Sequence, residues 1–136
     1  MQNKPQVQRN WYIFDASTMP LGRICSKIPS FLIGKHKTEY KPNLDIGDHV
    51  VVINTDQLYL TGNKEKSKRY YKHSGYLGST TITEFKDAKQ KDSEKIIIKS
   101  VSGMLPKNKL SKIRMSRLHL YKCEKHPHQN IKFINI

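Results

Sequence analysis

The chain is poor in cysteine and has no long apolar run. Its two cysteines, Cys25 and Cys123, are too few for the disulfide framework of a small secreted domain, so we interpret them as reduced thiols. No apolar run approaches the roughly 20 residues that a membrane-spanning helix needs. The polar N-terminus also lacks the apolar stretch of a signal peptide. These absences argue against a secreted or membrane-spanning protein.

Acidic residues are also scarce relative to basic ones. The 136 residues include 25 Lys and Arg but only 11 Asp and Glu, which gives a formal net charge of +14. Residues 61–136 hold eighteen of the basic and six of the acidic side chains. So large an excess opposes compaction unless a polyanion neutralises it. Nucleic acid is the first candidate partner and an anionic membrane surface the second.

The length predicts a single domain over residues 11–136, preceded by a flexible basic arm at residues 1–10. Residues 11–14 are aromatic and β-branched and predict a buried strand. Residues 21–33 repeat apolar side chains at three- and four-residue spacing, so they predict a helix that Gly34 ends and that Pro29 kinks or breaks. Residues 50–53 form an all-apolar run that predicts a second buried strand, and hence a parallel strand–helix–strand unit.

The second half predicts shorter elements. Met104 and Leu105 are expected to be core anchors, and Ser93 is expected to cap a helix that ends at Gly103 and Pro106. The other predicted elements are a strand at 58–60, a turn at 61–63, a helix from Thr83, a basic helix at about 108–114, a last strand at 118–121 and an irregular tail from Glu124.

Three basic segments are candidates for phosphate contact. The first, residues 34–41, follows the predicted helix and has a plainer interpretation as a solvated helix terminus. The second, residues 64–73, mixes cations with Tyr70 and Tyr71, and aromatic rings can stack on bases. Its alternative is an amphipathic edge strand with one of the two tyrosines in the core. The third, residues 99–117, places cations around a Gly/Pro turn.

No catalytic or metal site is predicted. The glycine-rich motifs that cradle nucleotide phosphates are missing, and the Ser, His and Asp residues form no local nucleophile arrangement. Asp45 and Asp48 fit a turn better than a metal pair. Cys123, His126 and His128 lack a fourth zinc ligand and a standard spacing. We therefore expect no cofactor and no small-molecule substrate.

Several blocks, in order, resemble the bacterial-type large-subunit ribosomal protein thirteen family over about residues 11–128. The blocks lie at residues 11–16, 21–23, 34–48, 51–54, 61–64 and 70–76, at Gly103-Met104-Leu105-Pro106-Lys107-Asn108 with Leu110, and at His126-Pro127-His128. The resemblance implies a three-layer α/β fold around a mainly parallel four-stranded sheet. It also implies binding to large-subunit ribosomal RNA, a role in early subunit assembly, contacts with neighbouring ribosomal proteins and no enzymatic activity.

The expected RNA contacts lie in the basic segments and the family blocks. They are Arg23, Lys35, His36, Lys37, Lys41, Lys64, Lys66, Lys68, Arg69, Tyr71, Lys72, His73, Lys107, Asn108, Lys109, Lys112, Arg114, Arg117, His126 and His128. The expected location is the ribosome, in bacterial cytoplasm, a plastid or a mitochondrion. Two other functions stay open, namely a free RNA-binding translational regulator and a nucleotide-handling enzyme on an α/β scaffold.

Overall fold

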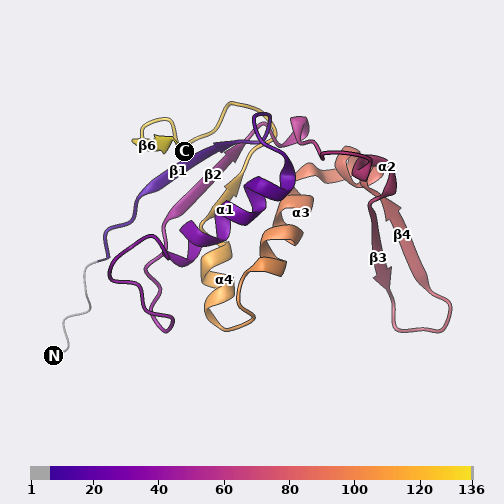
Figure 1. Cartoon of the computed structure of the whole chain (residues 1–136), viewed down its shortest axis with the longest axis horizontal. Helices are drawn as coiled ribbons and strands as arrows, with labels where there is room; N and C mark the ends of the chain where they lie inside the picture. The colour runs from indigo at the N-terminus through magenta and orange to yellow at the C-terminus, as the bar shows by residue number, and fades with distance from the viewer. Residues whose placement is uncertain (1–6, 136) are drawn as a thin grey trace.

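The computed structural model describes residues 7–135 and is built around a four-stranded parallel sheet (Figure 1). The strands stand in the order β5-β2-β1-β6, and all three neighbouring pairs are parallel. Their bounds are Trp11–Asp15 for β1, His49–Ile53 for β2, Leu118–Leu120 for β5 and Phe133–Asn135 for β6. The predicted mainly parallel four-stranded sheet is therefore confirmed.

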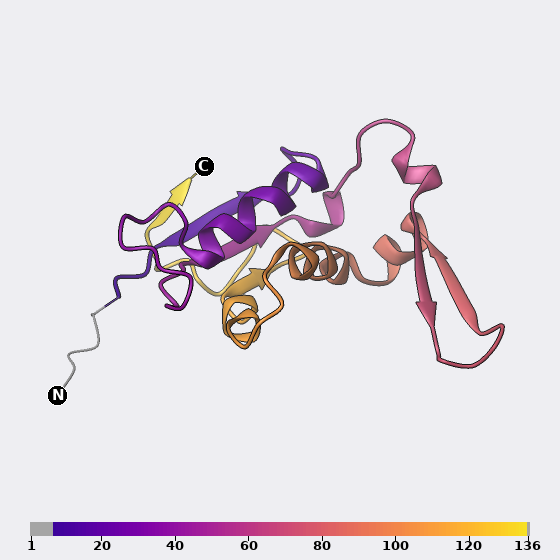
Figure 2. The ribbon, with the colours of Figure 1, turned by 60° about the horizontal axis from the view of Figure 1, so that its bottom comes forward.

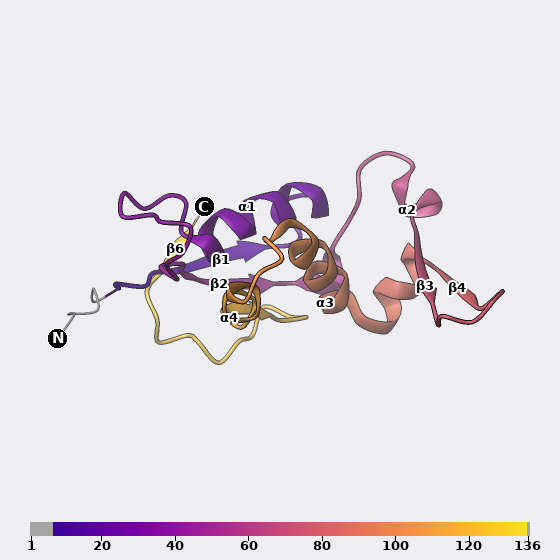
Figure 3. The ribbon, with the colours of Figure 1, turned by 90° about the horizontal axis from the view of Figure 1, so that it is seen from below.

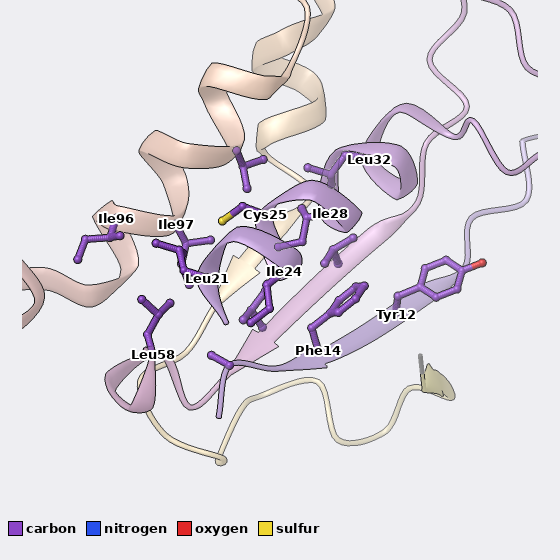
Figure 4. Close-up of a cluster of buried hydrophobic side chains, with 14 of the residues drawn as sticks. Tyr12, Phe14, Leu21, Ile24, Cys25, Ile28, Leu32, Leu58, Ile96 and Ile97 are labelled. Atoms are coloured by element: carbon purple, nitrogen blue, oxygen red, sulfur yellow. The ribbon is translucent and has the colours of Figure 1, made fainter. Parts of the chain in front are cut away.

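Helices α1 (Leu21–Ile33) and α3 (Phe85–Met104) pack on one face of the sheet, and α4 (Leu110–Met115) lies beside both. Alternate strand residues, Tyr12 and Phe14 in β1 and their register partners in β2, point into this layer and join the main core cluster (Figure 4). Gly34 ends α1, as predicted, and does so in a left-handed conformation. The helix continues through the buried Pro29 instead of breaking there.

Aromatic and imidazole rings line the other face of the sheet. The Trp11 ring stacks on His49 at a centroid distance of 4.2 Å and lies 5.4 Å from His119 and 5.0 Å from His128. Burial, followed by the neighbouring His119, lowers the pKa of His49 to about 4, so this ring is neutral at pH 7. His128 belongs to the C-terminal segment, which thereby covers this face (Figure 3). The three layers are helices, sheet and C-terminal segment.

The remaining elements connect β2 to α3. They are the 3₁₀ turn η1 (Thr55–Gln57), the short helix α2 (Lys64–Ser67) and an antiparallel hairpin of β3 (Arg69–His73) and β4 (Thr80–Glu84). Figures 1 and 2 show this hairpin extending away from the sheet and its helices. The hairpin overturns the predicted helix from Thr83, because Thr83 pairs with Tyr70 and the helix begins two residues later at Phe85.

The strand predicted at residues 58–60 is also absent. Leu58 is fully buried there, but the chain runs past the start of α1 rather than along a neighbouring strand. The backbone carbonyl of Tyr59 accepts a hydrogen bond from the Leu21 N–H at 3.1 Å. One of the unpaired amides at the helix N-terminus is satisfied in this way, which a side-chain cap would otherwise do.

Ser93 is not the cap of a separate helix. Asp92 has extended backbone angles inside α3, and its carboxylate accepts a hydrogen bond from the Lys95 backbone N–H, so Asp92 caps the second part. The buried Ser93 hydroxyl instead contacts Asp56 at 2.6 Å and Thr55 at 2.9 Å. Ser93 therefore holds α3 against η1.

The C-terminal tail is irregular only as far as Lys132, because residues 133–135 form β6 against β1. At the other end of the chain, residues 1–6 of the predicted arm lie outside the described residues. The following residues are held to the body. The Arg9 guanidinium donates to the Gly47 carbonyl at 2.9 Å, and the Asn10 N–H donates to Asp48 at 2.9 Å.

Residues 45–48 cross the end of α1 so closely that only glycine fits at position 47. A Cβ atom on Gly47 would lie 1.8 Å from the carbonyl oxygen of Leu32. On each side of Gly47 a carboxylate is fixed by a cation. Asp45 pairs with Arg117, and Asp48 lies 2.5 Å from the Lys37 ammonium. Burial alone would raise the Asp45 pKa, but hydrogen bonding and charge from Arg117 outweigh it and lower the pKa.

We expect Gly47→Ala to destabilise the protein by about 1–3 kcal/mol or more, because backbone must move to admit the methyl group. Gly103→Ala is the matched control. Gly103 lies in the last turn of α3 with nothing within 4 Å of an added Cβ, so alanine should gain up to about 1 kcal/mol. Urea unfolding followed by circular dichroism measures both. Equal stability of Gly47→Ala and the wild type would contradict the close crossing.

The prediction of two core anchors before Pro106 is half right. Leu105 is 3 % exposed and belongs to the core cluster, but Met104 is 51 % exposed and the expectation for it is wrong. Leu105 faces inward just after the end of α3, whereas Met104, the last residue of the helix, faces outward.

We therefore expect Leu105→Ala to lower the free energy of unfolding by about 2–5 kcal/mol, because it leaves a cavity in the core. Met104→Ala should stay within about 0.5 kcal/mol of the wild type. Chemical denaturation of both variants distinguishes the positions, and a larger loss in Met104→Ala would overturn the assignment.

Candidate nucleic-acid interface

The most exposed basic region is the segment 68–84, which we call the basic hairpin. Its register pairs Arg69 with Glu84 at the base and His73 with Thr80 near the tip. No acidic residue occurs between positions 68 and 83. Glu84 lies 3.9 Å from Arg69, and both side chains are about half exposed, so this pair neutralises little of the positive charge of the hairpin.

The two tyrosines of β3 face opposite ways, as the strand alternation predicted. Tyr70 packs against the core cluster, where the Lys99 ammonium lies 4.8 Å from its ring centroid and the Lys68 ammonium 5.6 Å. Tyr71 is 63 % exposed and sits opposite Ile82 on the open face of the hairpin. Tyr70 therefore anchors the hairpin to α3, and Tyr71 is left for a partner.

A basic cleft adjoins the base of the hairpin. It has a volume of about 540 Å³, and its cationic lining comes from Arg23 at the start of α1, Lys64 in α2 and Lys68. Lys66 is exposed on the same short helix. The structure thus brings together predicted contacts that are up to 45 positions apart in the sequence. Lys68 belongs to both the basic cleft and the basic hairpin, so the two form one surface.

Residues 34–41 are divided between solvent and interior. Lys35 and Lys41 are exposed. His36 and Lys37 turn toward the fully buried Asp48, with His36 Nε2 2.8 Å and Lys37 Nζ 2.5 Å from its carboxylate oxygens. These two contacts hold the loop to Asp48, the residue that precedes β2. His36 is nevertheless exposed, and both residues stay predicted RNA contacts.

The α3–α4 turn keeps only some of its predicted contacts at the surface. Lys107, Lys109 and Lys112 are exposed, as is Asn108, whose side-chain oxygen accepts a hydrogen bond from the Leu110 N–H at 3.1 Å. Asn108 therefore also shapes the start of α4.

Two of the predicted RNA contacts, Arg114 and Arg117, are buried in the structure. Arg114 is 1 % exposed, and two of its guanidinium nitrogens have no hydrogen-bond partner among the described residues. Arg117 is 5 % exposed and is bound to Asp45 through both terminal nitrogens. The helix α4 and its C-terminal turn direct both side chains inward, and RNA contact by these two residues stays a prediction.

His126 and His128 are half-buried in the C-terminal segment. His128 Nε2 lies 2.9 Å from the Tyr121 hydroxyl, and the His126 ring meets Phe133 at 5.4 Å. These contacts hold the segment on the sheet, and RNA contact by the two histidines stays a prediction. Among residues 7–135 no three His, Cys, Asp or Glu side chains are grouped to hold a metal ion. In the same range no helix is long and apolar enough to cross a membrane.

Sequence reasoning missed the tip of the basic hairpin. Tyr76 is 79 % exposed and Leu77 fully exposed, on a turn whose glycines, Gly75 and Gly78, both have positive φ angles. The flanking glycines were the available signal. Glycines with positive φ angles are typical of hairpin turns, so they indicate that the residues between them lie at the tip of a hairpin.

Comparison with known proteins identifies the family. The family model for ribosomal protein L13 matches residues 9–127. The large ribosomal subunit protein uL13 of Coprothermobacter proteolyticus is 46% identical over 95% of this chain and 90% of its own length. The proteins of the same name from Ureaplasma parvum and Desulfitobacterium hafniense are 45% and 44% identical, each over 90% of this chain and over 83% and 86% of their own lengths. The fold, the ordered blocks and these matches show that the chain belongs to the ribosomal protein L13 family.

Proposed function

We propose that this protein is a structural, non-catalytic constituent of the large ribosomal subunit, where it binds large-subunit ribosomal RNA and supports early assembly and translation. Its relatives are named as proteins of that subunit. Its partners would be the ribosomal RNA and neighbouring ribosomal proteins, and its location the ribosome of a bacterium or an organelle.

One observation carries the proposal, namely the continuous basic surface formed by the basic cleft and the basic hairpin. Its cations come from α1, α2 and β3 and face little opposing charge. A free protein gains nothing from such a surface, because like charges repel. RNA phosphates would neutralise it and release counterions, which makes a large favourable contribution to this kind of binding.

The arrangement suits a folded RNA better than a regular duplex. Cations in a concave cleft and on a projecting hairpin can follow phosphates on two separate parts of an RNA surface. The exposed Tyr71 adds a ring that can contact a sugar or a base. The exposed lysines at positions 35, 41, 107, 109 and 112 would extend the contact across the body of the protein.

We expect the double variant Arg69→Ala/Lys72→Ala to bind bacterial large-subunit ribosomal RNA more weakly and with a smaller salt dependence. Each phosphate contact removed should reduce the slope of log K against log salt by about 0.7–0.9. Filter binding or fluorescence titration at several salt concentrations measures the slope.

The matched control is Lys125→Ala/Lys132→Ala, which removes the same charge from exposed positions on the C-terminal segment. Strand β6, which directly follows Lys132, lies at the end of the molecule away from the hairpin (Figure 1). If both double variants lose the same slope, the effect is net charge alone and the basic hairpin is not a specific contact.

A further inference from the structure

We propose that the tip of the basic hairpin is a base-stacking element in which Tyr76 stacks on an unpaired base of the bound RNA. The inference rests on the proposed function and deepens it, because it assigns a chemical task to a segment that carries no charge of its own. The supporting observations are the exposure of the tip, its rigid geometry and the charges behind it.

The packing of the fold does not explain why the side chains at the tip are apolar and exposed. Tyr76 is 79 % exposed and Leu77 is fully exposed, whereas Tyr70 on the same hairpin packs against the core cluster. Two adjacent large apolar side chains so far from the core contribute little to folding. Exposed apolar groups gathered at the end of a projecting element are typical of a contact site.

The turn is held in one shape. The Ser74 N–H donates to the Ser79 carbonyl at 3.3 Å, and the Ser79 N–H donates to the Tyr76 carbonyl at 3.2 Å. The Gly75 N–H donates to His73 Nδ1 at 2.9 Å, and the hydroxyls of Ser74 and Ser79 are in contact. A ring presented on a turn with this many internal hydrogen bonds loses little backbone entropy on binding.

The charges around the tip favour RNA over a protein as the partner. Arg69, Lys72 and His73 lie behind Tyr76 on β3, and the nearest acidic side chain along the hairpin is Glu84 at its base. A polyanion would place its phosphates beside these cations and leave its bases for the ring. In a duplex both faces of a base are covered by its neighbours, so the base that Tyr76 meets is an unpaired one.

The test combines affinity with photo-crosslinking, using the full chain and bacterial large-subunit ribosomal RNA. Tyr76→Ala should weaken binding roughly 5- to 150-fold at fixed salt, which is the range for loss of one stacked base. Its salt slope should equal that of the wild type, because no cation is removed. Tyr76→Phe keeps the ring and should bind as the wild type does.

Ultraviolet irradiation of the wild-type complex, followed by trypsin digestion, should give a nucleotide adduct on the peptide of residues 73–86, located at Tyr76. Wild-type affinity in Tyr76→Ala, or an adduct found only elsewhere, would overturn the proposal. Normal RNA binding by Tyr76→Ala combined with its loss from large subunits in cells would also overturn it, since the tip would then contact a protein. Absence of salt-dependent binding by the wild type would instead refute the proposed function itself.

Discussion

The rest of the structure depends on two carboxylates that hold one crossing of the chain. Asp45 binds Arg117, Asp48 binds Lys37, and the glycine between them lets residues 45–48 pass against the end of α1. These contacts connect the N-terminal arm, the end of the first helix, the start of β2 and the turn before β5. The crossing therefore lies where β1, β2 and β5, which are neighbours in the sheet, begin.

Because these carboxylates pair with cations inside the body, the unpaired positive charge of the protein lies mainly elsewhere. In the body, several of the few acidic side chains pair internally with cations, and the sheet is covered by aromatic and imidazole rings and by apolar side chains. In the basic hairpin and basic cleft the cations have little opposing charge. The body, on the one hand, and the basic hairpin with the basic cleft, on the other, therefore have different tasks. The body provides a rigid base, and the basic hairpin and basic cleft present cations with little opposing charge to the proposed RNA partner, beside the exposed lysines of the body.

Local patterns predicted what local forces determine. The apolar spacing of residues 21–33 and the following Gly34 predicted α1, and the apolar runs at 11–14 and 50–53 predicted β1 and β2. β6 was missed because its three residues become a strand only by pairing with β1, more than a hundred positions away. The strand expected at 58–60 failed because its backbone satisfies a helix terminus instead. Among the expected RNA contacts, the exposed hairpin cations followed from composition. The inward turn of Lys37 and Arg117 depends on carboxylates that a local window does not contain.

Sedimentation of ribosomes through sucrose after a high-salt wash tests the account most directly, with this protein followed by mass spectrometry. The account predicts that the protein stays with the large subunit, because many phosphate contacts and a folded body hold it there together. Release of the protein to the top of the gradient, while the large subunit remains intact, would contradict it and would indicate a free or peripheral RNA-binding protein.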